Sequence, residues 1–384
     1  MEIYEVWADE VIGKIREKME WVSEKNRDKI PYTTDENGNY DDRSDLSVKW
    51  GEADGLDWWT NGFWGGLMWL LYQDTKKEKY AEIARSCEEK LSGCFDAYYG
   101  LHHDVGFMFQ PTASYDYRLT GNEKSRRTAL HAANLLAGRF NPIGKYIRAW
   151  NDMPKDDTRG WAIIDCMLNL SLLYWASEET KDPRFKHIAM LHADTVMDAF
   201  IRKDGSVCHI VEFNPETGER LKSHGGQGYA HGSSWTRGQG WAIYGFMVSY
   251  HHTGKKEYLQ TAQKVAEYCI VNLAKSGLIP VDFKQPKQPA WEDSCAAVII
   301  AGGLLDLADC VSETEQERYR KTAFKILNTL YQQRCDFSHS CDAIVKNCTG
   351  AYHSSIHHQT MVYADYYFIE AVYRLKRADM IRCF

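Results

Sequence analysis

Apolar residues are distributed along this chain in two alternating kinds of segment. In six segments nearly every position is apolar or small, which is typical of buried helices; these lie at residues 59–72, 104–117, 160–177, 240–252, 294–309 and 359–375. In six others the apolar positions recur every three or four residues, which predicts helices with one buried face; these lie near residues 3–22, 78–93, 123–138, 183–200, 256–273 and 315–333. The alternation predicts an all-α fold, an (α/α)6 barrel of six inner and six outer helices, with residues 1–384 in a single domain.

A short motif repeats in the helices with one buried face. An aromatic residue is followed four positions later by Ala, which places both on one helix face, at Tyr80/Ala84, Phe185/Ala189, Tyr258/Ala262 and Tyr319/Ala323, with a weaker copy at Ser125/Ala129. The copies are unevenly spaced, so we expect the additional residues in loops between outer and inner helices, gathered at one mouth of the barrel. An open α-solenoid is the alternative. Glycine and aromatic residues at the start of the inner segments favour the barrel, because a solenoid has no shared central cavity.

Residues 224–245 combine many glycines with large aromatic side chains. This composition predicts a loop that leads into an inner helix from Trp241 onward and directs Trp235, Arg237 and Trp241 toward a cavity. Trp rings stack on sugars and Arg pairs with carboxylates, so a substrate loop and a structural turn are both compatible with this stretch. A little β-structure is expected at residues 203–213, where an Asp-Gly turn precedes alternating apolar positions.

Composition narrows the possible functions. Aromatic residues make up 13% of the chain, with 13 Trp and 23 Tyr, which suits a carbohydrate cleft or a large aromatic core. The net charge is −7 and no run of Lys or Arg occurs, so we expect no nucleic-acid partner. No apolar run reaches about 18 residues, which predicts no membrane span. No nucleotide-binding motif is present, and we expect no cofactor.

The 11 cysteines are scattered and form no CxxC pair. Many lie in apolar helical segments, which predicts reduced core residues of a cytoplasmic protein rather than a metal site. The amphipathic N-terminus has neither the basic nor the apolar region of a signal peptide, which also favours the cytoplasm. A signal removed before residue 1 would leave no trace in this sequence, and the oligomeric state is expected to be a monomer or a homodimer.

Two carboxylates are candidates for chemistry. Asp165 lies in an apolar inner segment, with Asn169 four residues later on the same helix face. A buried carboxyl tends to have a raised pKa, as a general acid needs at neutral pH; a helix or loop cap is the alternative. Asp104 precedes another inner segment, where Asp is usually a cap. Together across a cavity they would form the carboxylate pair of glycosidic chemistry.

Other residues are candidates for substrate binding, but the sequence signal for each one alone is weaker. Trp58 and Asn61 belong to the segment WWTNGFW, which suits either a sugar platform or core packing. Trp150 could line the cavity, whereas a lone histidine such as His209 is more often structural. His102 and His103 precede Asp104, but adjacent residues rarely bind one ion, so we expect no metal.

Together these segments resemble glycoside hydrolase family 88, the unsaturated glucuronyl hydrolases. The resemblance extends from about Trp58 to Tyr373 and is carried by WTNGFW, HHDVGF, IRAWN, GWAIIDCMLNLSLLYWAS and GYAHGSSWTRGQGWAIYG. It implies an (α/α)6 barrel that removes a 4,5-unsaturated uronic acid from lyase-generated, glycosaminoglycan-derived oligosaccharides by hydrating its C4=C5 bond. It also implies Asp165 as general acid/base and Asp104 as second acid. The substrate contacts that it implies are Trp58, Asn61, Trp150, His209, Gln227, Trp235, Arg237 and Trp241.

The chain also departs from the family pattern. His231 and Gly232 stand where acidic residues are more common, and Gly226 stands where a histidine often precedes the matching glutamine. Ser354 and Ser355 lie in a last loop that resembles the family less well, in the region from which family members recognise sulfate, so they are candidate sulfate contacts.

Three other functions are compatible with parts of the sequence. An unsaturated rhamnogalacturonyl hydrolase would have the same barrel, but the segment RGQGW favours the glucuronyl substrate. A sugar 2-epimerase would use paired histidines, for which the inner helices offer no supporting context. A glycan-binding barrel would need neither aspartate.

Overall fold

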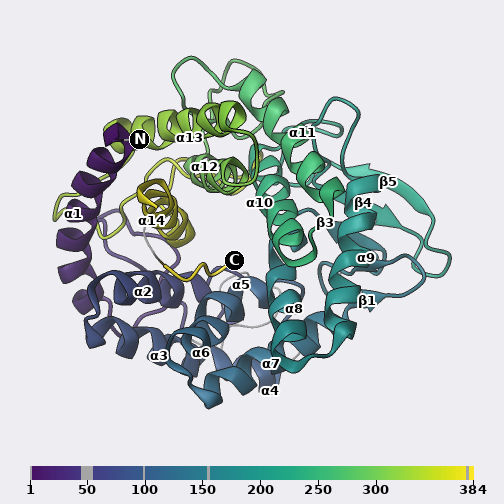
Figure 1. The fold of residues 1–384 in the computed structure, drawn as a ribbon, viewed down its shortest axis with the longest axis horizontal. Helices are drawn as coiled ribbons and strands as arrows, with labels where there is room; N and C mark the ends of the chain where they lie inside the picture. Colours follow the sequence, from purple (N-terminus) through teal and green to yellow (C-terminus); the bar gives the residue numbers. More distant parts are fainter. Residues whose placement is uncertain (1, 45–54, 98–99, 154–155, 378–379) are drawn as a thin grey trace.

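The computed structural model describes residues 2–44, 55–97, 100–153, 156–377 and 380–384, and arranges their helices in two concentric rings (Figure 1). The inner ring consists of α2 (Gly62–Thr75), α5 (Val105–Phe109) with its continuations η1 (Gln110–Ser114) and α6 (Tyr115–Thr120), α8 (Cys166–Thr180), α10 (Thr236–Thr253), α12 (Ser294–Ala308) and α14 (Val362–Lys376). The outer ring consists of α1 (Glu2–Lys25), α3 (Glu78–Ser92), α7 (Glu123–Gly138), α9 (Pro183–Ala199), α11 (Lys256–Asn272) and α13 (Glu313–Gln333), and a short helix, α4 (Cys94–Ala97), follows α3. Because α14 packs on α2 as well as on α12, the inner ring closes. The predicted (α/α)6 barrel is confirmed.

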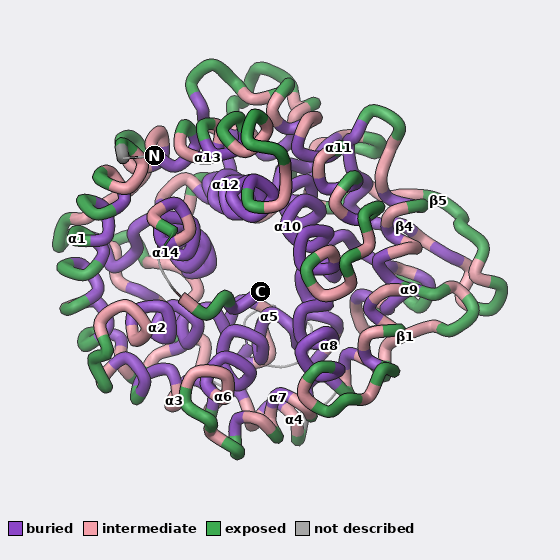
Figure 2. Tube along the Cα trace, in the orientation of Figure 1, coloured by how far each residue is buried: buried purple, intermediate pink, exposed green. Residues whose placement is uncertain are grey.

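Burial follows the two predicted hydrophobic patterns. Figure 2 shows the inner helices buried along almost their whole length, whereas the outer helices alternate between buried and exposed positions. Every residue of α12 is buried, and its neighbour α13 buries only one stripe of residues. A helix buried all round can be apolar all round, and a helix at the surface needs only one apolar stripe.

The connections differ in length at the two ends of the barrel. An inner helix passes to the next outer helix through a short turn, and the residue after the inner helix is left-handed at Lys76, Gly121, Lys181, Gly254 and Arg377. An outer helix returns to the next inner helix through a longer segment, such as residues 139–165 or 200–235. The long loops therefore gather at the N-terminal ends of the inner helices, here called the open mouth, as the uneven repeat predicts.

Three inner segments differ in detail from the prediction. The second is not one regular α-helix, because Pro111 lies in the π-helical turn η1, where it has no N–H to donate. The third becomes helical only at Cys166, since residues 161–163 pair as a strand. The fourth begins at Thr236 instead of Trp241, so the second half of the glycine-rich stretch is helix rather than loop.

Two small antiparallel sheets lie outside the rings. One pairs β1 (Phe140–Asn141) with β2 (Tyr146–Ile147). The other has the order β3 (Trp161–Ile163), β4 (Ile210–Phe213) and β5 (Arg220–His224). The predicted Asp-Gly turn forms, with Gly205 at φ 89° and an isolated bridge beside it, but the strand expected at 203–213 is regular only from Ile210.

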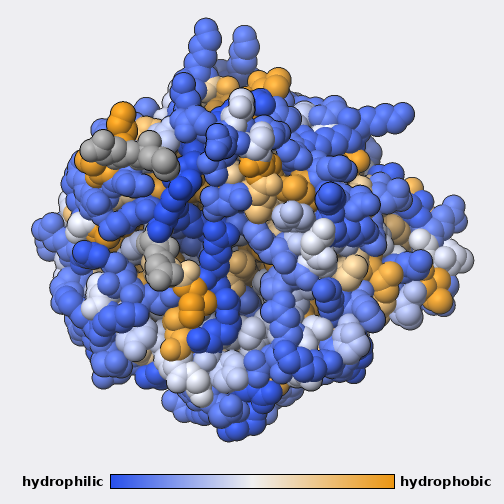
Figure 3. Space-filling view, viewed as in Figure 1, coloured by the Kyte–Doolittle hydropathy of each residue, from blue (hydrophilic) through white to orange (hydrophobic). Residues whose placement is uncertain are grey.

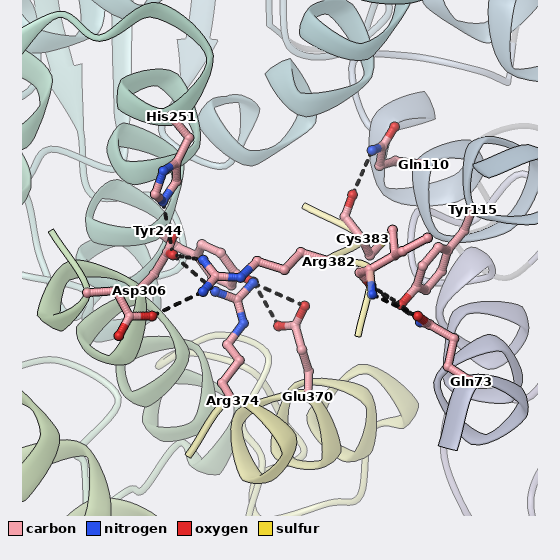
Figure 4. Close-up of polar contacts among 12 residues, drawn as sticks. Gln73, Gln110, Tyr115, Tyr244, His251, Asp306, Glu370, Arg374, Arg382 and Cys383 are labelled. Atoms are coloured by element: carbon pink, nitrogen blue, oxygen red, sulfur yellow. Dashed lines mark hydrogen bonds and ion pairs between the residues drawn. The ribbon is translucent and has the colours of Figure 1, made fainter. Parts of the chain in front are cut away.

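The C-terminal ends of the inner helices are covered by residues 380–384, and we call this side the closed end (Figure 1). The Phe384 ring lies 6.2 Å from Phe107 and 6.1 Å from Tyr367 between ring centroids, inside the inner ring. In Figure 4, Arg382 reaches across to Asp306 while Cys383 approaches Gln110, whose amide donates to the Cys383 carbonyl at 2.7 Å. A cavity of about 430 Å³ lies beside this tail.

All 11 cysteines are free thiols and nine are buried, in agreement with their predicted place in the core. The closed-end face in Figure 3 is largely hydrophilic, with apolar side chains in small scattered groups. None of the helices in the described part of the chain is long and apolar enough to cross a bilayer.

Candidate active site

The residues that immediately precede the inner helices converge at the open mouth. They are Asn61, Asp104, Asp165, Trp235, Asp293 and Met361. Four of these six were singled out by the sequence. Each helix N-terminus carries a partial positive charge. The mouth therefore stabilises negative charge, both on a bound ligand and on the two carboxyls.

Asp165 is held at the mouth by the strand and helix on either side of it, β3 and α8. Its side chain is almost fully buried, and its Oδ1 has no hydrogen-bond partner among the described residues. Burial raises the pKa of Asp165 to about 7, and the nearby positive charge of Arg237 opposes the rise. Near neutral pH both protonation states are therefore populated, as a group that donates and later accepts a proton requires.

Asp104 is the second buried carboxyl of the mouth. Its Oδ1 accepts a hydrogen bond from the Asn169 amide nitrogen at 3.0 Å, and its Oδ2 lies 3.5 Å from His102 Nδ1 and 3.4 Å from His103 Nε2. Burial raises the pKa of Asp104 well above its usual range, and the charge of Asp165 raises it further. The structure thus brings together the two carboxyls predicted to act as a pair.

His102, His103 and Asp104 also place three potential metal-ligand atoms within 4.8 Å of one another. His102 Nδ1, however, accepts the Asp104 backbone N–H at 3.4 Å, so its lone pair already has a partner. The absence of a metal stays a prediction, and we assign no ion to this group.

His209 connects Asp165 to the loop that precedes α10. Its Nδ1 accepts the Gln227 backbone N–H at 3.0 Å, which leaves the proton of the neutral ring on Nε2, 3.8 Å from Asp165 Oδ1. Burial lowers the pKa of His209 to about 3, so the ring is neutral at physiological pH. The Trp235 ring packs against it at 4.2 Å between centroids. At 3.8 Å the neutral ring lies beside the acid without a hydrogen bond to it, so His209 adds no charge next to Asp165.

Arg237 is buried and bound to protein groups. Its Nη1 pairs with Asp293 at 2.5 Å and donates to the Thr349 carbonyl at 2.9 Å, and its Nη2 donates to the Gly350 carbonyl at 2.5 Å. Gln227 Nε2 donates to the same Gly350 carbonyl at 2.7 Å. Arg237 therefore fixes the last loop to α10, and Gln227 fixes it to the loop before α10. A direct contact of either residue with substrate stays a prediction.

The sequence did not single out Asp293, the partner of Arg237. It precedes an inner helix, as Asp104 and Asp165 do in the structure, and its place directly before the apolar segment 294–309 is the signal that could have identified it.

The predicted aromatic platforms are buried to different degrees. Trp58 and Trp150 are partly exposed, so their rings can reach a ligand. Trp241 is buried, between Phe107 at 5.0 Å and Tyr367. These positions favour stacking by Trp58 and Trp150 and packing by Trp241.

Asn61 and the two serines complete the predicted site. The Asn61 amide nitrogen donates to the Gly55 and Leu56 carbonyls, so it organises the loop before α2. Ser354 is half-buried and Ser355 is exposed, on the loop that follows Gly350. Sulfate recognition by these serines stays a prediction.

Comparisons with known proteins identify the family of the chain. Residues 21–376 match the family model described as Glycosyl Hydrolase Family 88. The unsaturated glucuronyl hydrolase of Bacillus sp. (strain GL1) is 35% identical over 344 residues, which cover 87% of this chain and 90% of that protein. The unsaturated chondroitin disaccharide hydrolase of Streptococcus pneumoniae (strain ATCC BAA-255 / R6) is 29% identical over 323 residues, which cover 82% of this chain and 81% of that one.

The fold agrees as well. The crystal structure of an unsaturated glucuronyl hydrolase from Bacillus sp. GL1, described as responsible for the degradation of glycosaminoglycan, matches with a TM-score of 0.89 at 30% identity. The match covers 96% of this chain and 97% of that chain.

Proposed function

Because the chain belongs to glycosyl hydrolase family 88, we propose that it removes a 4,5-unsaturated glucuronyl residue from the non-reducing end of lyase-generated oligosaccharides. Its relatives include an unsaturated chondroitin disaccharide hydrolase and an enzyme responsible for glycosaminoglycan degradation. These relatives support a glycosaminoglycan-derived substrate.

The reaction hydrates a vinyl ether instead of attacking the anomeric carbon. A proton is added to C4 while water adds to C5 and loses its own proton, so the C4=C5 bond is consumed with one water molecule. The product is a hemiketal, which opens and releases the remaining sugar with a free hydroxyl group. One residue that first donates a proton and then accepts one can serve the whole sequence.

Asp165 is the residue that suits this role, and the observation that carries the proposal is its buried carboxyl at the mouth, whose Oδ1 has no partner among the described residues. Burial raises its pKa to about 7, in keeping with that role. In its protonated form it protonates C4, and as a carboxylate it accepts the proton of the attacking water. The buried carboxyl of Asp104 lies nearby and serves as the second acid. The N-termini of the inner helices attract the uronate carboxylate, and Trp58 and Trp150 offer rings to the sugars.

The test uses Asp165→Asn and a disaccharide made by a glycosaminoglycan lyase. Hydration removes the ultraviolet absorbance of the C4=C5 bond, so wild-type protein should bleach the substrate. The variant should lose roughly 10²–10⁴-fold in kcat while remaining folded, because general acid–base catalysis contributes about that factor. A wild-type protein that leaves this disaccharide intact but bleaches one from pectin would transfer the proposal to rhamnogalacturonyl substrates. Full activity of the variant would remove Asp165 from the mechanism.

A further inference from the structure

Asn169 connects the two helices that carry the catalytic aspartates. It lies on α8, its side chain is fully buried, and its amide faces the start of α5. Its Oδ1 accepts the Phe107 backbone N–H at 2.7 Å, and its Nδ2 donates to Asp104 Oδ1 at 3.0 Å. A backbone N–H can only donate, so the first contact fixes which end of the amide is oxygen and which is nitrogen.

This orientation has a consequence for Asp104. Since the Asn169 nitrogen can only donate, Asp104 Oδ1 must accept, and a proton on this carboxyl belongs on Oδ2. We propose that Asn169 is a positioning residue, which holds the Asp104 carboxyl with Oδ1 as a fixed acceptor and Oδ2 as the oxygen that carries and exchanges its proton. This inference rests on the proposed function, because it assigns Asp104 a part in the same reaction.

The contact of Asn169 with the start of α5 depends on a close approach of α5 and α8 at Gly106. A Cβ on Gly106 would lie 2.4 Å from Asn169 Oδ1 and 2.7 Å from its Cα. Only glycine leaves room for the amide to reach both the backbone of α5 and the acid before it.

Among the described residues, the charged and titratable groups around Asp104 are His102 and His103 from its own loop, Asp165 and Cys166 at the start of α8, and Arg139 at the end of α7. Donation by Asn169 stabilises the ionised form of Asp104, and so lowers the pKa of the carboxyl pair. Loss of the donor must therefore move the titration of the pair to higher pH.

The experiment measures kcat and KM against pH for Asn169→Asp, which is nearly isosteric. It keeps an oxygen acceptor for the Phe107 N–H and replaces the amide donor by a carboxyl, whose negative charge also raises the pKa of the pair; Asn169→Ala adds no charge and isolates the loss of the donor from this charge. We expect kcat at neutral pH to fall about tenfold or more, KM to change less than about twofold, and the pH optimum to rise by about one unit or more, because the ionised carboxyl loses a hydrogen bond that stabilises it. Asn169→Ala, which removes both contacts, should shift the optimum in the same direction.

Asn26→Leu is the matched control, because Asn26 is a buried amide that donates to the Asp342 carboxylate at 3.1 Å and has no hydrogen bond to Asp104, Asp165 or Asn169. It should lower the thermal midpoint and leave the pH optimum unchanged. Asn169 variants that lose stability without moving the optimum, or that keep wild-type kcat, would overturn the positioning role. A wild-type protein without hydrolase activity would instead overturn the proposed function.

Discussion

Replacing Asp165 by Asn should stabilise the protein, and increasingly so as the pH rises. Burial raises the pKa of this carboxyl from 3.8 to about 7 in the folded protein. In the unfolded chain the group ionises near its ordinary value. Between these two values the folded protein holds a proton that the unfolded chain has released, so folding is progressively disfavoured as the pH rises through this window.

The magnitude follows from the size of the shift. Roughly 3 units at about 1.4 kcal/mol each give a destabilisation of up to about 4 kcal/mol once the pH exceeds the folded value. At about pH 5 the destabilisation is only about 1.7 kcal/mol, because this pH lies only about one unit above the pKa of the carboxyl in the unfolded chain. The advantage of Asp165→Asn over wild type should therefore grow by about 2–3 kcal/mol between about pH 5 and about pH 8.

Equilibrium unfolding in urea, or thermal unfolding where it is reversible, measures this difference. For a chain of 384 residues, 1 kcal/mol corresponds to on the order of 1 °C in Tm. The quantity to compare is how the stability difference between Asp165→Asn and wild type changes with pH. The intrinsic cost of burying an amide is the same at each pH, so it cancels from this change. An advantage that stays constant or shrinks toward alkaline pH would refute the argument that burial holds this acid protonated.

Two further predictions concern pH and the closed end. In the wild-type enzyme, kcat should fall as the pH rises through about 7, because the proton donor Asp165 is then lost; a pH profile that stays flat to about pH 9 would contradict its role as donor. Asp306→Asn should lower the free energy of unfolding by about 3–5 kcal/mol, because it removes the buried partner of His251, Arg374 and Arg382. Urea unfolding at neutral pH checks this value, and a loss below about 1 kcal/mol would contradict it.

The sequence predicted the barrel well because the outer helices repeat a simple hydrophobic pattern. Tyr258 and Ala262, one copy of the repeat, are both buried on the inward face of α11. The inner helices were predicted because nearly every position in them is apolar. Neither pattern depends on long-range contacts, so composition over one or two turns was sufficient.

The sequence could not place the boundaries that tertiary contacts decide. Residues Trp161–Ile163 are as apolar as the helix that follows, and only pairing with β4 makes them a strand. As a result Asp165 precedes its helix instead of lying within it.

The partner of a charged residue is equally invisible along the chain. Arg237 and Asp293 are 56 positions apart and are joined only when α10 and α12 pack together. The sequence therefore suggested a free cation for the substrate, whereas the fold gives this cation a buried carboxylate and two carbonyls.

The tail at residues 380–384 has a consequence for how sugar chains meet this enzyme. With Phe384 packed against aromatic rings inside the inner ring and Arg382 bound to Asp306, the tail fills the centre of the inner ring from the closed end. A polysaccharide cannot be threaded through the barrel, so only a chain terminus can reach the carboxyls. The released sugar must back out through the opening by which it entered, and a second chain must wait until it has left.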